Sequence, residues 1–155
     1  MKAREIAYLF EEIAPVESGL QSDRDRRVLG FRFGNPEIDV TGVGVAWFLA
    51  MEVIEQAIRR GLNLLLIHEP GLFYENSAPW HTTLLPDTNP VNLKKKQLLI
   101  ENNMCVYTAH SNWDLQKHVG NQPTFAKALG LTKEIKRDIA VGVYQVQPMT
   151  FSDLI

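Results

Sequence analysis

The stretch LLLIHEPGLFY, from Leu64 to Tyr74, decides the fold that the rest of the chain is expected to build. It opens with four uninterrupted apolar residues, and His68, Glu69 and a Pro-Gly pair follow at once. A short apolar run bounded by turn residues is typical of a strand that is buried on both faces. Because proline ends the ladder of main-chain hydrogen bonds, we expect an imidazole and a carboxylate at the end of this strand.

A second stretch repeats the arrangement. Met104 to Ala109 is apolar, and His110 and Asp114 follow it. In open parallel sheets, ligands bind beyond the carboxyl ends of the strands. Two neighbouring strands of this kind would bring two imidazoles and two carboxylates to one edge. The functional hypothesis is therefore a metal site made of His68, Glu69, His110 and Asp114.

Strands and helices alternate along the rest of the chain. Period-two or continuous apolar patterns predict strands at residues 28–33, 40–48, 64–67, 104–109 and 139–146. Helical spacing of apolar residues predicts helices at 4–13, 51–60, 91–103 and 124–129. A strand–helix–strand order with short connections indicates parallel strands. The predicted fold class is α/β, with three layers, a mainly parallel sheet flanked by helices, and a single domain over residues 1–155.

The pattern also assigns side chains to the core. The buried stripe of the first helix is predicted to comprise Ile6, Leu9, Phe10 and Ile13. In the helix at 91–103 the inward residues are predicted to be Leu93, Leu98 and Leu99, with lysines on the solvated face. Trp47 is expected in the core, with a place in a pocket as the alternative. Cys105 is expected to be a buried, protonated and inert thiol.

Composition limits the partners and the compartment. The formal net charge of −2 offers no basic patch for nucleic acid. A single cysteine, Cys105, cannot form an intrachain disulfide and indicates a reducing compartment. The opening MKAREIAYLF lacks the apolar core of a signal peptide, and no apolar run reaches membrane-spanning length. We therefore expect a cytoplasmic protein that has neither nucleic acid nor membrane as a partner.

Two further segments carry predictions. Residues 71–90 contain Trp80, His81 and several prolines, and are expected to form a long surface loop over the strand ends. His81 and His118 lie among polar residues and are expected to be surface histidines. The sequence from Thr150 to Asp153 has the form of a capping box, which predicts the start of a helix just before the last residue. Such an ending predicts a shortened chain, either a fragment or a naturally shortened product.

The donor set favours a divalent ion. Neutral imidazole suits iron, zinc and manganese, and carboxylates bind the harder ions, magnesium included. Two such ions held close together can share one hydroxide and polarise a substrate oxygen. The alternative is that His68 and His110 merely end their strands and that Asp114 caps the next helix. We prefer the metal hypothesis because both histidines follow buried strands and both lie beside a carboxylate.

Several blocks of the sequence resemble the Nif-three-like family, whose members are described as GTP cyclohydrolase 1 type 2 homologues or dinuclear metal centre hexameric proteins. The blocks are NPEIDVTGVGVA, EVIEQAIRRGLNLLLIHEPGLFY, VYTAHSNWD and the closing MTFSDLI. The resemblance implies the N-terminal half of that family's three-layer fold and ring-like homo-oligomers. In the family the C-terminal half brings a further His and Glu to the site, and these residues are absent here.

The resemblance also implies roles for the site residues. The family sequence His-His-Pro-Leu corresponds to the block that starts at His68, and Ala-His-Thr-Asn-Leu-Asp corresponds to residues 109–114. His68 and Asp114 thereby match metal ligands, and His110 matches a ligand or its near neighbour. Glu69 replaces the second histidine of the family pair and matches by position only. Its carboxylate shifts the expected preference toward manganese or magnesium.

Two functions remain open at this point. The first is a metal-dependent hydrolase of a small molecule, related to a nucleotide, with water activated by the metal as the nucleophile. The metal would be zinc, manganese, iron or magnesium. The second is a non-catalytic oligomeric module for interaction or regulation, which keeps the family scaffold after its metal site has degraded.

Overall fold

The structure is a computed structural model that describes residues 1–20, 22, 28–69, 89–138, 141–150 and 152. The described elements, in chain order, are α1 (Ala3–Glu11), the 3₁₀ helix η1 (Val16–Ser18), β1 (Gly30–Phe33), β2 (Val43–Phe48), α3 (Met51–Arg59), β3 (Leu64–Glu69), α4 (Pro90–Glu101), β4 (Cys105–Thr108), α5 (Ser111–Asp114), α6 (Asn121–Ala128), β5 (Lys133–Arg137) and β6 (Gly142–Gln145). Among these helices, none has the length and apolar character needed to cross a bilayer.

A four-stranded sheet in the order β1-β4-β3-β2 forms the centre of the fold. Strands β2, β3 and β4 run parallel, and β1 pairs with β4 in the antiparallel sense. The connection from β2 to β3 contains α3, and that from β3 to β4 contains α4. Such helical crossovers bring the chain back to start a parallel neighbour. The predicted α/β class with a mainly parallel sheet is therefore confirmed.

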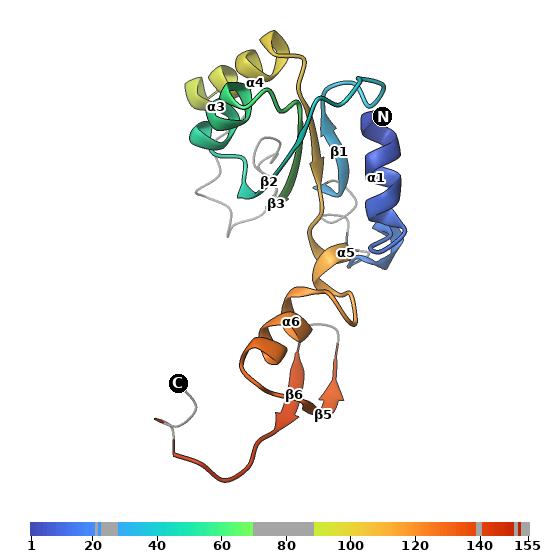
Figure 1. Cartoon of the computed structure of the whole chain (residues 1–155), viewed down its shortest axis with the longest axis vertical. Coiled ribbons are helices and arrows are strands. Elements are labelled where there is room, and N and C mark those ends of the chain that lie inside the picture. Colours follow the sequence, from blue (N-terminus) through green and yellow to red (C-terminus); the bar gives the residue numbers. More distant parts are fainter. Residues whose placement is uncertain (21, 23–27, 70–88, 139–140, 151, 153–155) are drawn as a thin grey trace.

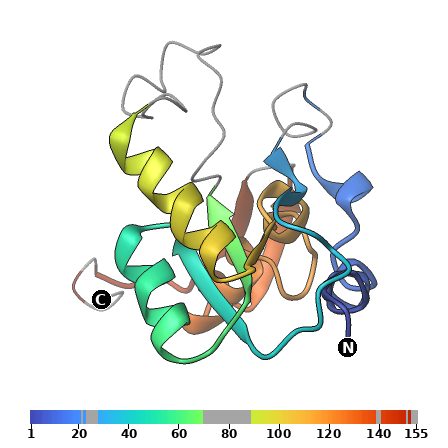
Figure 2. The same cartoon turned by 90° about the horizontal axis from the view of Figure 1, so that it is seen from above.

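Helices cover both faces of this sheet. In Figure 1 and, from above, in Figure 2, α1 lies on one side of the sheet, and α3 and α4 lie on the other. On the α3 side, Leu65 and Ile67 of β3 pack with Ile54. On the α1 side, Leu64 packs with Ala3. The predicted three layers are present, and β3 lies in the middle layer and packs against both helical layers.

The sequence of β3 explains its central place. Leu64, Leu65 and Ile67 are all at most 3% exposed, and they point to opposite faces of the sheet. Full burial of a Leu or Ile side chain stabilises a fold by about 1.5–3 kcal/mol. A strand with apolar residues at successive positions gains this energy only between two covering layers, which is what the run at 64–67 predicted.

The buried face of α1 differs from the prediction. Ala3 and Ala7 are buried, whereas Leu9 and Ile13 are 50% and 54% exposed. The prediction is correct for Ile6 and Phe10, which pack against the core from this helix. Small alanine side chains let a helix approach a sheet closely. The helix therefore turns its alanine stripe inward and leaves Leu9 exposed, whereas Ile13 lies beyond the end of α1.

A similar correction applies to α4. Leu99 is fully buried, but Leu93, which was predicted to point inward, is 53% exposed. The polar Asn92 is buried in its place. The helix is therefore rotated about its axis relative to the predicted face.

Local signals explain several element boundaries. Gly61 follows α3 with φ of 66°, a left-handed conformation that glycine adopts without steric cost. The Asn89 side chain caps α4 by accepting a hydrogen bond from the Val91 N–H at 2.9 Å. Pro90 occupies the first helical position, where its missing N–H leaves no bond unmade.

Strands β5 and β6 form a second, antiparallel sheet. The sequence predicted β6, within residues 139–146, but not β5. The reason is that the KEIKR sequence of β5 is mostly charged and exposed, so that it has no apolar period. Residues 71–88 of the predicted loop, which include Trp80 and His81, lie outside the described residues. Phe151 and Asp153 of the predicted capping box also lie outside them. The single domain remains a proposal.

The lone cysteine is part of the core, as predicted. Cys105 is fully buried, and its thiol donates a hydrogen bond to the Phe33 carbonyl oxygen at 3.2 Å. Burial raises the pKa of the Cys105 thiol to about 11, from an ordinary value of 9.0. The neutral thiol is therefore the form that the folded protein keeps.

This shift predicts a stability loss at alkaline pH. The unfolded thiol ionises near pH 9.0 and the folded one only near 11, so the contribution of Cys105 is complete below pH 9 and is lost as the pH rises toward 11. The expected loss is on the order of 1–3 kcal/mol. Urea unfolding at pH 8, 9, 10 and 11 measures it.

The variant Cys105→Ala serves as the control. It should be less stable at every pH because of the cavity, but its stability should fall less steeply between pH 9 and 11. Parallel slopes for the two proteins would contradict the prediction.

Candidate metal centre

The two histidines meet at the carboxyl edge of the sheet. His68 is the second-last residue of β3, and His110 follows β4 by two residues. Because β3 and β4 are parallel neighbours, their carboxyl ends lie at the same edge of the sheet. The two imidazole ring centroids lie 4.9 Å apart, with the rings tilted by 53°. The prediction that His68 and His110 share one edge is confirmed.

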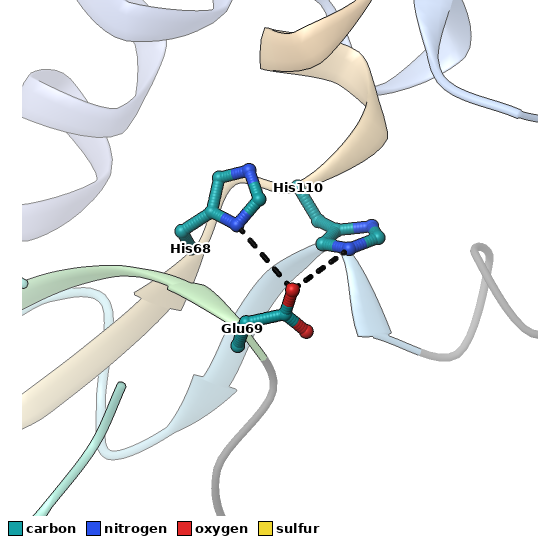
Figure 3. Close-up of side chains that lie close together, drawn as sticks. All are labelled: His68, Glu69 and His110. Atoms are coloured by element: carbon teal, nitrogen blue, oxygen red, sulfur yellow. Dashed lines mark ion pairs between the residues drawn. The ribbon is translucent and has the colours of Figure 1, made fainter. Parts of the chain in front are cut away.

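The carboxylate of Glu69 points toward both rings (Figure 3). Its Oε1 atom is 3.8 Å from His68 Nδ1 and 3.6 Å from His110 Nε2. One donor atom from each of the three residues lies within 4.8 Å of the other two. Within the described part of the chain, the buried Nδ1 atom of His68 has no hydrogen-bond partner. The three side chains thus present converging donors, one of which has an unused lone pair or proton.

Glu69 reaches this position from the last residue of β3. It still pairs in register with Phe48 of β2, so its main chain is extended. Neighbouring residues of a strand point to opposite faces. Its flexible side chain nevertheless brings the carboxylate to His68 at the strand end. The bend predicted at Pro70 and Gly71 lies outside the described residues.

Asp114 approaches His68 from the opposite edge of the imidazole. Its Oδ1 atom lies 2.8 Å from His68 Nε2 and also accepts a hydrogen bond from the Asn121 side chain. An imidazole that donates through Nε2–H keeps a lone pair on Nδ1. Of the four predicted ligands, three therefore form the converging group, and Asp114 contacts it through His68. Whether each binds metal remains a prediction.

The arrangement is acidic and moderately accessible. The side chains of His68, His110 and Glu69 are 12%, 20% and 30% exposed, and that of Asp114 is 29% exposed. The described ion pairs of both carboxylates are with imidazoles. Two carboxylates beside two imidazoles give a site that favours cations and that a small molecule can reach.

Asn112 fixes the loop that carries His110, a role that the sequence analysis missed. This residue is fully buried. Its side chain accepts a hydrogen bond from the His110 N–H at 3.0 Å and donates one to the Ala14 carbonyl at 2.8 Å. The available signal was an Asn two residues after His110, where its side chain can bond the local main chain.

Trp47 also belongs to the site, and its predicted place in the core is wrong. Its indole stacks on the His68 imidazole, with ring centroids 3.9 Å apart and an interplanar angle of 14°. Trp47 is 50% exposed. The physical reason is that β2 is an edge strand of the sheet. His118, in contrast, is exposed, as predicted, and is not a member of the group formed by His68, Glu69 and His110.

Comparison with known proteins gives the family. The whole chain, residues 1–155, matches the family model Duf34/NIF3 (NGG1p interacting factor 3). A GTP cyclohydrolase 1 type 2 homolog of Clostridium perfringens is 35% identical over 138 residues, which are 89% of this chain and 48% of the relative. A protein of the same name from Clostridium acetobutylicum is 31% identical and is matched over 99% of this chain and 57% of its own length.

Solved structures give the same result. Reduced HcgD from Methanocaldococcus jannaschii has a TM-score of 0.70 and 27% identity over 86% of this chain and 49% of its own. A Bacillus cereus protein related to NIF3 has a TM-score of 0.69 and 28% identity, over 85% of this chain and 33% of its own. The chain thus spans about half the length of the curated relatives it matches. By sequence and by fold, the chain belongs to the DUF34/NIF3 family.

Proposed function

We propose that His68, Glu69, His110 and Asp114 form a site for a divalent cation. The observation that carries the proposal is the convergence of two imidazoles and a carboxylate within 4.8 Å at the carboxyl edge of a parallel sheet. His68, Glu69 and His110 would hold the ion. Asp114 would complete the site from the far edge of His68, as the carboxylates behind metal-binding histidines do.

The two distances from Glu69 to the imidazoles are close to the spacing of donors around one small ion. Donor atoms bound tetrahedrally at zinc-type bond lengths lie about 3.4 Å from one another. The two contacts of Glu69 Oε1, at 3.6 and 3.8 Å, differ from that spacing by a few tenths of an ångström. The contact between His68 Nε2 and Asp114, at 2.8 Å, has the length of a direct hydrogen bond. These lengths favour Nδ1 as the metal-facing atom of His68.

The proposed activity is metal-dependent hydrolysis of a small, nucleotide-related molecule in the cytoplasm. When bound, a divalent cation supplies activation of water and polarisation of a substrate oxygen. Glu69 would balance the charge of the ion, and Asp114 would hold the proton at His68 Nε2. The nucleotide class rests on the names of the relatives, which are GTP cyclohydrolase 1 type 2 homologs. Zinc, manganese, iron and magnesium all suit this donor set.

Titration calorimetry of the purified protein with zinc, manganese and magnesium tests the site. The wild-type protein should bind at least one of these ions, and Glu69→Gln should bind it at least tenfold more weakly because it loses the anionic donor. Glu69→His should shift the preference from magnesium toward zinc, since imidazole is the softer ligand.

His118→Ala is the matched control, because it removes an exposed histidine outside the three-residue group. It should bind like the wild type. If neither the wild type nor Glu69→His binds any of the ions, the hydrolase is excluded in favour of the second function.

The second candidate function is a homo-oligomeric interaction module. It is favoured by an apolar stripe on the edge strand β2, formed by Val43, Val45 and Trp47, which are 37%, 81% and 50% exposed. Among the described strands, β2 pairs only with β3, so its outer edge offers main-chain hydrogen bonds. A second copy of the chain would supply the same edge and the same stripe, as a two-fold interface requires.

The variant Val45→Lys tests this module. A charge at this exposed position should block pairing of edge strands and convert the oligomer to monomer, while the melting temperature of the monomeric fold stays within a few degrees. Light scattering at micromolar concentration measures the state. Wild-type protein that is already monomeric, or a variant with an unchanged mass, would contradict the prediction.

A further inference from the structure

Trp47 stacks on His68, but the proposed cation site gives Trp47 no role. The indole lies against the imidazole at 3.9 Å and almost parallel to it, at 14°. The position is one residue before Phe48, which pairs with Glu69, so the indole and imidazole come from side-by-side positions on neighbouring strands. Adjacent side chains on one sheet face contact one another directly.

Two contacts together fix the His68 ring. The hydrogen bond to Asp114 holds the ring at Nε2 but leaves rotation about that contact. A flat surface against one face of the ring removes this rotation. With both contacts in place, the remaining edge of the ring turns Nδ1 toward Glu69 Oε1, 3.8 Å away.

We propose that Trp47 is the positioning residue for His68, and that its indole sets the plane in which Nδ1 faces the metal centre. This inference rests on the proposed cation site. Trp47 supplies no donor atom to the ion. It acts by removing a rotation that the imidazole would otherwise lose only when an ion binds, and such preorganisation raises affinity.

The exposure of Trp47 separates this role from a structural one. Half of the side chain lies in solvent, so the core receives little of its area. On the same strand face, Val45 is 81% exposed and lies opposite Leu66 rather than His68. A replacement at Val45 therefore reproduces any effect on the strand and leaves the imidazole stack intact.

The experiment compares Trp47→Phe with Trp47→Leu. Phenylalanine keeps a flat ring for the stack, whereas leucine fills a similar space without one. The expected result is that Trp47→Leu binds zinc or manganese at least tenfold more weakly than wild type, while Trp47→Phe stays within threefold of it. Val45→Ala, the matched control, should also stay within threefold.

A second measurement needs no metal. In the wild-type protein, the carbon-bound ring protons of His68 should be shifted upfield in the NMR spectrum by the ring current of the indole. The shift should be retained in part by Trp47→Phe and lost in Trp47→Leu. The signals are assigned by their loss in His68→Gln.

The outcomes distinguish the two proposals. Absence of ion binding by the wild type defeats the cation site, and the NMR comparison then still decides whether Trp47 orients His68. Unshifted His68 protons in the wild type, or equal metal affinities for Trp47→Leu and Trp47→Phe, would overturn the positioning role.

Discussion

Parallel pairing of β3 with β4 is the constraint on which the rest of the structure depends. The register that places Leu64 opposite Cys105 and Ile67 opposite Thr108 brings the carboxyl ends of the two strands to the same edge of the sheet. The side chains of His68 and His110 therefore lie close together at this edge. The helices α3 and α4 make the pairing parallel, since each returns the chain to the starting edge of the sheet. The order of strands and helices along the chain thereby determines that the two histidines meet at one edge of the sheet.

Much of this fold could be predicted from the sequence because buried positions appear as apolar residues at regular spacings. The run at residues 64–67 has apolar residues on both strand faces, and such a strand must lie between two layers. The histidines that end both runs were predictable as neighbours for the same reason. Gly61 marked the end of α3 through main-chain geometry, which is a property of the residue itself. The family resemblance added the expected roles of Asp114 and Glu69.

The remainder depends on contacts between distant segments, which leave no period in the sequence. Trp47 was expected in the core because tryptophan is large and apolar, yet its strand lies at an edge of the sheet. Leu9 was assigned to the buried face of α1 by its spacing, but the close approach of Ala3 and Ala7 decided the rotation of the helix. The bond between Asp114 and His68 joins residues 46 positions apart, and the spacing alone could not separate a ligand from a supporting carboxylate.

The hydrogen bonds of Asn112 have a mechanical consequence. One buried amide joins the main chain at His110 to the main chain at Ala14, and a second link joins the Leu20 N–H to the Ser111 hydroxyl at 3.0 Å. Moving either segment alone would leave buried polar groups without hydrogen-bond partners, which costs about 1–3 kcal/mol for each group. The turn after α1 and the loop after β4 are therefore coupled, and neither moves without the other. The turn after the N-terminal helix is not part of the candidate site, yet its contact with Asn112 helps to fix the position of His110.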